Sequence, residues 1–287
     1  MKVLITGATG QVGRALVASA PHDVELVPCT HAELDVSESE AVASRIRVHA
    51  PEVVVNAAAY TAVDRAESEP ELARRINSEG PRYLAVAARA AGARLIHLST
   101  DFVFDGNSSV PYRPDSVTSP LSTYGLTKRD GEEGVASVLP RAIILRTAWV
   151  YAAQGRNFVH TMLRLMRTNG SVRVVADQVG TPTTAQSVAQ AIWKIIEAPQ
   201  LAGVHHWTDA GVASWYDFAV AIAEEGAQLG LLPREVSVTP ISSAEYPTPA
   251  RRPHYSVLDR RSLVALAIPQ LHWRARLREV LAEIARG

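Results

Sequence analysis

The feature that most constrains the fold is a glycine-rich turn that directly follows the first apolar run of the chain. After Val3-Leu4-Ile5 the sequence reads Thr6-Gly7-Ala8-Thr9-Gly10-Gln11-Val12-Gly13, with the spacing G-x-x-G-x-x-G, and a helical pattern begins there. In this position Gly7 permits a tight turn, Gly10 lets the backbone approach a pyrophosphate, and Gly13 lets the helix pack closely on the strand. The N–H groups at the helix start would bind phosphate. We therefore predict a dinucleotide site; the alternative is an ordinary strand-to-helix turn.

Further short apolar runs recur along the chain, separated by helical patterns. The runs lie near 53–55, 95–98 and 142–145, and the helical patterns lie near 11–19, 38–49, 70–91 and 120–137. Runs without alternation indicate strands that are covered on both faces, and helices between them indicate right-handed crossovers in a parallel sheet. The predicted fold class is therefore α/β, a doubly wound parallel sheet of the Rossmann type.

The pattern changes after Tyr151, where we expect a smaller lobe to begin. Helical stretches near 157–166 and 185–197 flank a short strand near 172–175, and residues 240–253 hold four prolines without periodicity, which predicts an ordered loop. We predict a nucleotide-binding domain of residues 1–150 plus roughly 183–208. The remaining segments, 151–182 plus roughly 209–287, would form a discontinuous substrate-binding lobe.

The composition argues against several kinds of partner. Lys+Arg and Asp+Glu both number 29, so there is no basic surplus to hold a nucleic acid backbone. No segment reaches the ~18 uninterrupted apolar residues of a membrane span. Cys29 is the single cysteine, which excludes an intrachain disulfide and indicates a cytoplasmic protein. The nine histidines show no ligand spacing, so we expect no catalytic metal.

The second predicted strand bears on the choice of cofactor. It ends Val27-Pro28-Cys29-Thr30-His31, without the carboxylate that NAD-selective sites usually place at this tip. We therefore predict that NADPH is accepted, with Thr30 and His31 near the 2′ position and NADH as a second cofactor. Asp35-Val36 would contact the adenine. The small residues before and within Ala59-Tyr60-Thr61 would let the cofactor lie against the third strand, although core packing also explains the alanines.

The fourth predicted strand and the helix after it carry the candidate chemistry. Ser99-Thr100-Asp101 closes the strand at the edge where ligands of open α/β folds bind. Tyr124 and Lys128 stand four residues apart, on one helix face. These features predict a carbonyl reductase in which Tyr124 donates a proton to the developing alkoxide and Thr100 holds that oxygen. Lys128 would lower the pKa of Tyr124 and bind the nicotinamide ribose. An ordinary helix pair is the alternative.

The chain as a whole resembles the extended short-chain dehydrogenase/reductases, and within them the dTDP-4-dehydrorhamnose reductase family. Besides the glycine turn and Tyr124-x-x-x-Lys128, four stretches carry the resemblance: Val55 to Asp64, Ser99 to Gly106, Arg146-Thr147-Ala148-Trp149-Val150-Tyr151, and Tyr246-Pro247-Thr248-Pro249-Ala250-Arg251-Arg252-Pro253. The resemblance implies reduction of the 4-keto group of dTDP-4-dehydro-β-L-rhamnose to give dTDP-β-L-rhamnose, the last step in making this activated sugar.

The resemblance also implies roles for individual residues. The family's catalytic positions fall on Thr100, Tyr124 and Lys128, of which the last two also count as cofactor contacts. Its other cofactor positions fall on Gly10, Gln11, Val12, Asp35, Val36, Ala59, Tyr60 and Thr61. Substrate positions fall on Thr100, Asp101 and Trp149, with Asn157 and Arg251 as further candidates. An arginine in the proline-rich loop would suit a diphosphate, whereas a solvated surface pair is the alternative.

The resemblance leaves the assembly and two other functions open. Some family members dimerise through magnesium held by glutamates, but this chain has Ala15 and Gln186 in the corresponding regions, so magnesium is doubtful here. Both a monomer and a homodimer stay open. One alternative function is a noncatalytic NADP-binding regulatory subunit, against which the intact Thr100, Tyr124 and Lys128 argue. The other is a reductase or epimerase that acts on another nucleotide sugar.

Overall fold

A six-stranded parallel sheet forms the larger part of the molecule. The computed structural model describes residues 1–233 and 235–287. The strand order is β10-β5-β4-β3-β1-β2. The strands are β1 (Lys2–Thr6), β2 (Glu25–Cys29), β3 (Val53–Asn56), β4 (Arg94–Thr100), β5 (Ile143–Thr147) and β10 (Gly203–His206). The predicted fold class is confirmed. Within the described residues β2 pairs only with β1, so this edge position accommodates Pro28, which has no N–H to donate.

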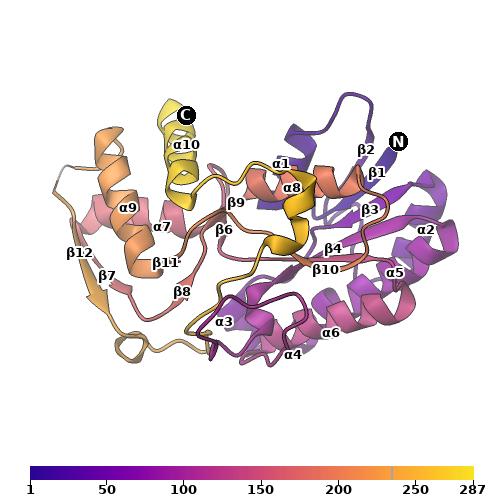
Figure 1. Ribbon diagram of the computed structural model, residues 1–287, viewed down its shortest axis with the longest axis horizontal. Coiled ribbons are helices and arrows are strands. Elements are labelled where there is room, and N and C mark those ends of the chain that lie inside the picture. The colour runs from indigo at the N-terminus through magenta and orange to yellow at the C-terminus, as the bar shows by residue number, and fades with distance from the viewer. Residues whose placement is uncertain (234) are drawn as a thin grey trace.

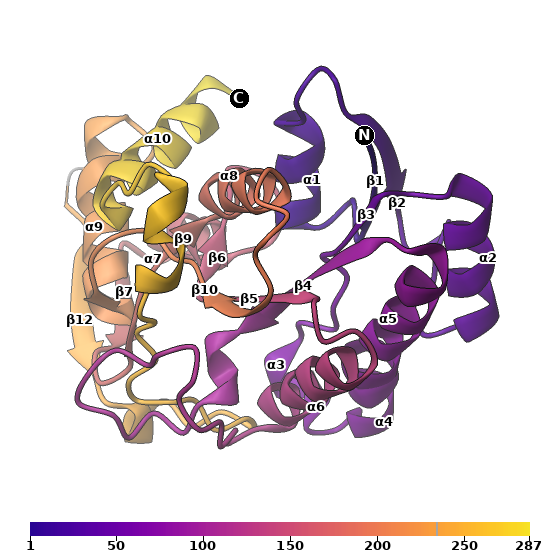
Figure 2. The ribbon, with the colours of Figure 1, turned by 45° about the vertical axis from the view of Figure 1, so that its right-hand side comes forward.

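Helices cover both faces of the sheet. Helices α1 (Gln11–Ala18) and α8 (Ala185–Ile196) lie on one face, and α2 (Ser39–His49), α5 (Gly80–Ala91) and α6 (Thr123–Val138) lie on the other (Figures 1 and 2). Strand β1 shows why both layers form, because Val3 and Ile5 pack with α1 and α8 whereas Leu4 packs with α2 and α5. Its continuous apolar run thus serves two cores.

The helical stretch predicted near 70–91 is divided into three parts. After the short α3 (Val63–Ala66), helix α4 (Pro70–Arg74) leads into a π-helical turn, Arg75–Glu79, and then into α5. Asn77 of this turn is buried, accepts from the Tyr60 amide over 2.8 Å and donates to the Tyr60 carbonyl over 3.0 Å. It also reaches the Thr127 hydroxyl on α6 over 3.3 Å. The wider turn therefore joins the end of β3 to α6.

A second core lies beside the sheet, to the left in Figure 1. It is formed by α7 (Phe158–Asn169), α9 (Trp215–Gln228), α10 (Trp273–Arg286) and the paired strands β7 (Ser171–Val175) and β12 (Ser237–Ile241). The short strands β6 (Val150–Tyr151), β8 (Val179–Gly180), β9 (Thr183–Thr184) and β11 (Ala213–Ser214) connect the two parts. Residues 240–253 contain the end of β12 and the 3-10 turn Ser243–Glu245, and are otherwise an irregular loop.

The packing bears on the division into two lobes, which we keep as a proposal. Helix α8 and strand β10 join the sheet, as the predicted boundaries have it, and α7, α9 and α10 share the second core. Leu263 and Ile268, which the prediction placed in the smaller lobe, pack instead with the core of the sheet. The 3-10 helix Arg261–Leu266 therefore packs with the part that contains the sheet.

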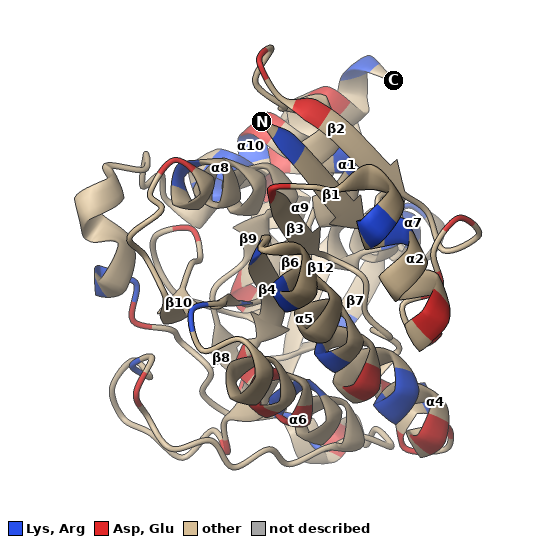
Figure 3. Ribbon diagram, turned by 90° about the vertical axis from the view of Figure 1, so that its right-hand side faces the viewer, with Lys and Arg blue, Asp and Glu red and all other residues tan. Residues whose placement is uncertain are grey.

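The outer helices carry both signs of charge. Figure 3 shows Lys and Arg interspersed with Asp and Glu along α4 and α6, whereas the charged residues of α5 are arginines. Pairs such as Arg74 with Glu71 and Glu79 account for part of this pattern. In the described part of the chain, no helix is both long enough and apolar enough to cross a bilayer.

Candidate active site

A cleft of about 650 Å³ lies at the carboxyl edge of the sheet, between the two cores. Of the residues predicted to form the site, Gly10, Gln11, Val12, Ala59, Thr61, Thr100, Asp101, Tyr124, Lys128, Trp149 and Asn157 line this cleft. Segments that are far apart in the sequence therefore meet where open α/β folds bind their ligands. The roles assigned to these residues remain predictions.

The glycine turn is closely packed, and this packing requires two of its glycines. Gly7 has a φ of +66°, which side chains disfavour, and its carbonyl accepts from the Gly10 amide over 2.9 Å. A Cβ on Gly13 would lie 2.2 Å from the Gly7 oxygen. The turn therefore lies directly against the first turn of α1, in the form that a dinucleotide site needs.

Gln11 and Asn157 join the glycine turn to the second core. Asn157 Nδ2 donates to Gln11 Oε1 over 2.9 Å and to the Ala152 carbonyl over 2.8 Å. Its Oδ1 caps α7 by accepting from the His160 amide. Because this amide group is already engaged at both ends, a sugar contact by Asn157 would have to replace one of these bonds. Its role in substrate binding stays a prediction.

The adenosine end of the predicted site lies at the tip of β2, outside the residues that line the cleft. Thr30 and His31 follow the strand directly, and Asp35 is fixed by accepting from the Ser37 amide over 2.9 Å. Val36 is buried. The sequence prediction had no carboxylate at this tip, but the chain turns back and places the Glu33 carboxylate 2.8 Å from the Thr30 amide nitrogen.

The segment after β3 contributes two of its three predicted cofactor residues to the cleft. Ala59 and Thr61 line it, whereas the Tyr60 side chain turns away and donates to Glu69. The Tyr60 main chain is held by two hydrogen bonds with the Asn77 side chain. Any contact that Tyr60 makes with a cofactor would therefore be through its main chain.

Tyr124 stands at the cleft wall beside Phe102, with ring centroids 5.5 Å apart in an edge-to-face arrangement. Burial raises the pKa of Tyr124 to about 12, and the Asp101 charge adds to the shift, while hydrogen bonding with Thr100 opposes it. Tyr124 is therefore a neutral phenol at all ordinary pH values, and it retains a proton to donate.

Lys128 lies behind Tyr124 and is almost completely buried. Its Nζ donates to the Leu98 carbonyl over 2.6 Å, and burial lowers its pKa to about 8 although Glu132 opposes this. This arrangement does not support the expectation that Lys128 lowers the pKa of Tyr124. The ammonium group is engaged by a main-chain carbonyl, and burial of the phenol has the larger effect.

Three buried polar atoms at the cleft wall have no hydrogen-bond partner within the described residues. They are Ser99 Oγ, Asp101 Oδ2 and Thr147 Oγ1. Burial raises the pKa of Asp101 to about 6, although its polar neighbours Ser256 and Thr100 oppose this, and its Oδ1 accepts from the Thr100 hydroxyl over 3.0 Å. Unsatisfied buried polar atoms are costly, so this end of the cleft is suited to a polar ligand that would pair with them.

An aromatic wall closes the cleft on the side of the second core. Trp149 adopts a left-handed backbone conformation with a φ of +48°, which is strained for a side chain of this size. Its indole stacks on Trp215 with ring centroids 3.5 Å apart and planes 2° apart. Sequence reasoning missed Trp215, although Ser214 and Asp217 form a capping box that marks the start of α9.

The arginine pair of the proline-rich loop is divided between the cleft and solvent. Arg252 lines the cleft and is held by Asp64, with Nη2 to Oδ2 at 2.8 Å and Nη1 to Oδ1 at 3.1 Å. Arg251, the predicted substrate residue, is exposed and is not among the lining residues. Adjacent residues of an extended chain point to opposite sides, so the Asp64 contact directs Arg251 outwards.

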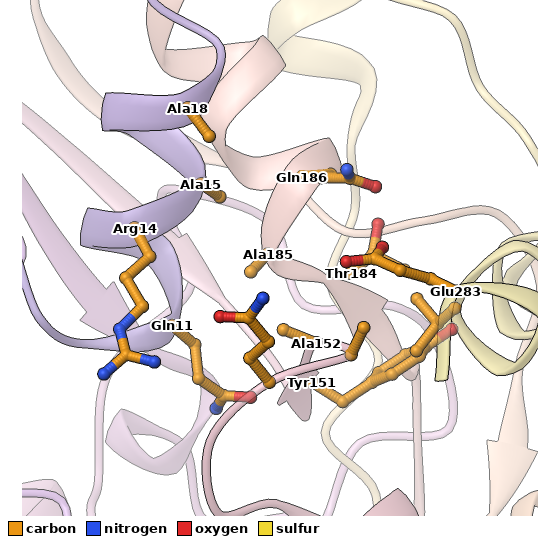
Figure 4. Close-up of a pocket in the computed structure, with 13 residues that line it drawn as sticks. Gln11, Arg14, Ala15, Ala18, Tyr151, Ala152, Thr184, Ala185, Gln186 and Glu283 are labelled. Atoms are coloured by element: carbon orange, nitrogen blue, oxygen red, sulfur yellow. The ribbon is translucent and has the colours of Figure 1, made fainter. Parts of the chain in front are cut away.

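A smaller cavity of about 130 Å³ lies between α1, α8 and α10. Figure 4 shows Ala15 and Gln186 on its walls, the two positions that made a magnesium site doubtful. Glu283 is the single acidic residue of this lining, and the described part of the chain has no group of three His, Cys, Asp or Glu that could hold a metal ion. Magnesium prefers several carboxylate and water oxygens, so this lining does not fit a magnesium site.

Comparison with known proteins gives consistent results. The family model described as the RmlD substrate binding domain matches residues 1–286. A dTDP-4-dehydrorhamnose reductase of Sinorhizobium fredii (strain NBRC 101917 / NGR234) is 45% identical over 264 residues, or 90% of this chain and 88% of the relative.

Two solved structures extend the likeness to three dimensions. The crystal structure of a dTDP-4-dehydrorhamnose reductase from Clostridium acetobutylicum ATCC 824 has a TM-score of 0.93 and 40% identity, covering 99% of each chain. The enzyme of the same name from Bacillus anthracis str. Ames, in complex with NADP, has a TM-score of 0.92 and 34% identity, covering 98% of this chain and 99% of the other. The chain therefore belongs to the dTDP-4-dehydrorhamnose reductase family.

Proposed function

We propose that this chain reduces the 4-keto group of dTDP-4-dehydro-β-L-rhamnose with NADPH and produces dTDP-β-L-rhamnose. The observation that carries the proposal is the convergence of Thr100, Tyr124 and Lys128 on one cleft beside the glycine turn. Relatives that cover nearly the whole chain bear the name of this reductase. The residues present suit the cofactor, because the glycine turn leaves its helix N-terminus open to a pyrophosphate.

The chemistry of the chain's own residues follows from their protonation. When bound, NADPH supplies the hydride that reduces the carbonyl carbon. Tyr124 then gives its phenolic proton to the carbonyl oxygen. With the hydride on carbon and the proton on oxygen, the ketone becomes a secondary alcohol. In this structure the Thr100 hydroxyl donates to Asp101 Oδ1 over 3.0 Å, so it would hold that oxygen by turning its O–H from Asp101 to the substrate. Lys128, whose pKa of about 8 keeps it mostly cationic at neutral pH, would bind the nicotinamide ribose while its Nζ also donates to the Leu98 carbonyl.

The sugar nucleotide would bind along the second core. Trp149 and Trp215 offer a flat apolar surface to the deoxysugar ring, and the unpaired Asp101 Oδ2 offers an acceptor to a sugar hydroxyl. Arg252, which lines the same cleft as Arg14 and Arg156 do, would offer its guanidinium to the diphosphate. These assignments extend the predicted substrate residues Thr100, Asp101 and Trp149.

The cellular location and the oligomeric state remain proposals. The single Cys29 supports a cytoplasmic location, because a lone cysteine has no second cysteine in the chain to pair with. The chain would act as a monomer or as a homodimer without magnesium, in line with Ala15 and Gln186 at the smaller cavity.

The test is a coupled assay at 340 nm. Purified protein is mixed with NADPH or NADH and with dTDP-4-dehydrorhamnose made in place from dTDP-glucose by the preceding enzymes. Loss of absorbance that depends on the sugar nucleotide supports the proposal and ranks the cofactors. Cofactor binding without oxidation would favour the regulatory subunit or another nucleotide sugar, and a parallel reaction with a UDP-linked keto sugar would test the latter.

A further inference from the structure

A cavity of about 220 Å³ lies at the amino edge of the sheet, opposite the edge that carries the catalytic cleft. It is lined by the three connections that lead into β4, β5 and β10, and it shares no residue with the cleft. Three arginines line it: Arg89 in the last turn of α5, Arg94 at the start of β4, and Arg141 just before β5. Among the described residues the lining contains no Asp or Glu, so three positive charges meet there without a carboxylate.

Two of these arginines also hold the ends of helices. Arg94 Nη1 donates to the Ile196 carbonyl over 2.9 Å at the end of α8, and its Nη2 donates to two further carbonyls of the same segment over 3.2 and 3.3 Å. Arg89 Nη1 donates to the Val138 carbonyl over 3.3 Å at the end of α6. Because cations stabilise helix C-termini, these contacts explain part of the positive charge.

The helix ends do not balance the arginines. A helix C-terminus carries about half a negative charge, so the ends of α5, α6 and α8 supply about −1.5 in total against three guanidinium groups. The acidic residues nearest in sequence are engaged elsewhere, since Glu197 pairs with Lys194 and Glu52 bonds to the start of the chain. A net charge of about +1.5 is therefore left at the cavity.

Arg141 has no structural contact that accounts for its position. It is exposed, and within the described residues its guanidinium makes neither a hydrogen bond nor an ion pair. Burial lowers the pKa of Arg94, and the charge of Arg141 lowers it further. The two like charges therefore disfavour each other, and an anion in the cavity would remove this repulsion.

The size and charge of the cavity define the class of ligand. Guanidinium groups bind phosphate oxygens through charge-assisted hydrogen bonds, often two at a time. Pockets for drug-sized molecules begin at about 300 Å³, so this cavity suits a phosphate or diphosphate group and is too small for a whole dinucleotide.

We propose that Arg89, Arg94 and Arg141 form a second anion site, which binds a free phosphate or diphosphate or the phosphate end of a nucleotide. The bound anion joins the ends of α5, α6 and α8 to the amino edge of the sheet. The inference goes beyond the proposed function and does not depend on it, because the site lies outside the catalytic cleft.

The test titrates the full chain with diphosphate in the presence of NADPH and measures binding by calorimetry. We expect a Kd on the order of 1 mM, which two or three hydrogen bonds to charged groups would supply. The midpoint of thermal unfolding should rise with diphosphate and not with sodium chloride at the same ionic strength. A Kd above about 20 mM, or an equal thermal shift with sodium chloride, would overturn the proposal.

Three variants locate the bound anion. Arg141→Gln should weaken diphosphate binding about tenfold, the order of one hydrogen bond to a charged group. Without diphosphate this variant should be no less stable than the wild type, because it loses only a repulsive charge. Arg47→Gln makes the same change in the exposed last turn of α2 and should leave the Kd within twofold. An equal loss in Arg47→Gln would show a general effect of charge and sink the proposal.

The third variant, Arg252→Gln, changes an arginine of the catalytic cleft and should also leave the Kd for diphosphate within twofold. A loss equal to that of Arg141→Gln would place the diphosphate in the cleft and reject the second site.

A parallel titration with ATP separates the two sources of the phosphate group. If ATP binds more tightly than diphosphate and Arg141→Gln weakens it, the site takes the phosphate end of a nucleotide. If diphosphate binds more tightly, the site takes the free anion. Binding of both ligands that is unchanged in Arg141→Gln would contradict the proposal.

Discussion

The two ends of the cleft are built in opposite ways. At the glycine turn the backbone amides of Ala8 and Gly10 are paired, and Gly13 packs so closely that a single added carbon would collide. At the reacting end, around Thr100 and Asp101, the side-chain atoms Ser99 Oγ, Asp101 Oδ2 and Thr147 Oγ1 stay unpaired among the described residues.

This difference separates binding from chemistry. A fully packed glycine turn presents the same shape to every dinucleotide, and binding of the sugar nucleotide adds no hydrogen bonds to it. Buried polar atoms without partners lower the stability of the folded protein, and they favour whichever ligand supplies the missing hydrogen bonds. We call the glycine turn and the first turn of α1 the cradle. The cradle is expected to tolerate little change of shape, and the reacting end is expected to tolerate little change in its polar groups.

The largest expected effect disables the reacting end and leaves the cradle intact. Tyr124→Phe removes the proton donor, so turnover should fall by a factor of about 10² to 10⁴. Affinity for NADPH, measured by calorimetry, should stay near that of the wild type because the ring is kept. Turnover equal to that of the wild type would exclude Tyr124 as the acid.

The second effect disables the cradle. Gly13→Ala places a Cβ 2.2 Å from the Gly7 oxygen, so the free energy of unfolding should fall by roughly 3 kcal/mol and NADPH should bind more weakly. Denaturant unfolding measures the first quantity. Gly134→Ala is the matched control, because its Cβ would lie 3.4 Å from the Arg82 side chain, an ordinary contact. Equal stability of the two variants would contradict the close packing.

The third effect tests which arginine serves the substrate end. Arg252→Ala should weaken binding of dTDP about tenfold, the order of one hydrogen bond to a charged group, whereas Arg251→Ala should change it less than twofold. NADPH affinity should change little in either variant. A larger loss in Arg251→Ala would favour the sequence prediction, which chose Arg251.

The smallest effect measures the stability lost at the reacting end. Burial raises the pKa of Asp101 from 3.8 to about 6, so the folded protein binds this proton more tightly than the unfolded chain does. The Asp101 contribution to stability therefore improves as pH falls from about 6 towards 4, and it is least favourable above 6.

Asp101→Asn should consequently raise the free energy of unfolding at pH 8. We expect about 1 kcal/mol, less than the pKa shift alone would give, because the new amide also lacks a partner. The gain should shrink near pH 4 in thermal unfolding experiments, and activity should fall. A variant that is less stable than the wild type at pH 8 would show that the buried charge is compensated.

The sequence predicted the sheet well because continuous apolar runs have few other uses. Val3-Leu4-Ile5 and its counterparts at 53–55, 95–98 and 142–145 all lie in the parallel sheet or at its ends. Helices α9 and α10 were not predicted, and the break of α4 and α5 by the π turn was also missed. The π turn depends on Asn77 bonding to a loop 17 residues away, which no local pattern reveals.

The candidate site was predictable where a motif fixes the position of a side chain. Tyr124 and Lys128 share a helix face, and Thr100 ends a strand, so their meeting at the cleft follows from the fold. The choice of Arg252 over Arg251 depends on Asp64, which is distant in sequence, and the approach of Glu33 to Thr30 depends on the shape of one turn. Such contacts come from tertiary structure.

The buried Asn77 has a consequence for any attempt to recombine this protein with its relatives. One amide side chain bonds to the main chain of Tyr60, between the cleft residues Ala59 and Thr61, and to the Thr127 hydroxyl, one turn along the helix from Tyr124. A parent that lacks the Thr127 hydroxyl, or in which the Tyr60 main chain is displaced, would leave that amide without one of its partners. A functional chimaera should therefore inherit residues 57–61, the turn at 75–79 and helix α6 from a single parent.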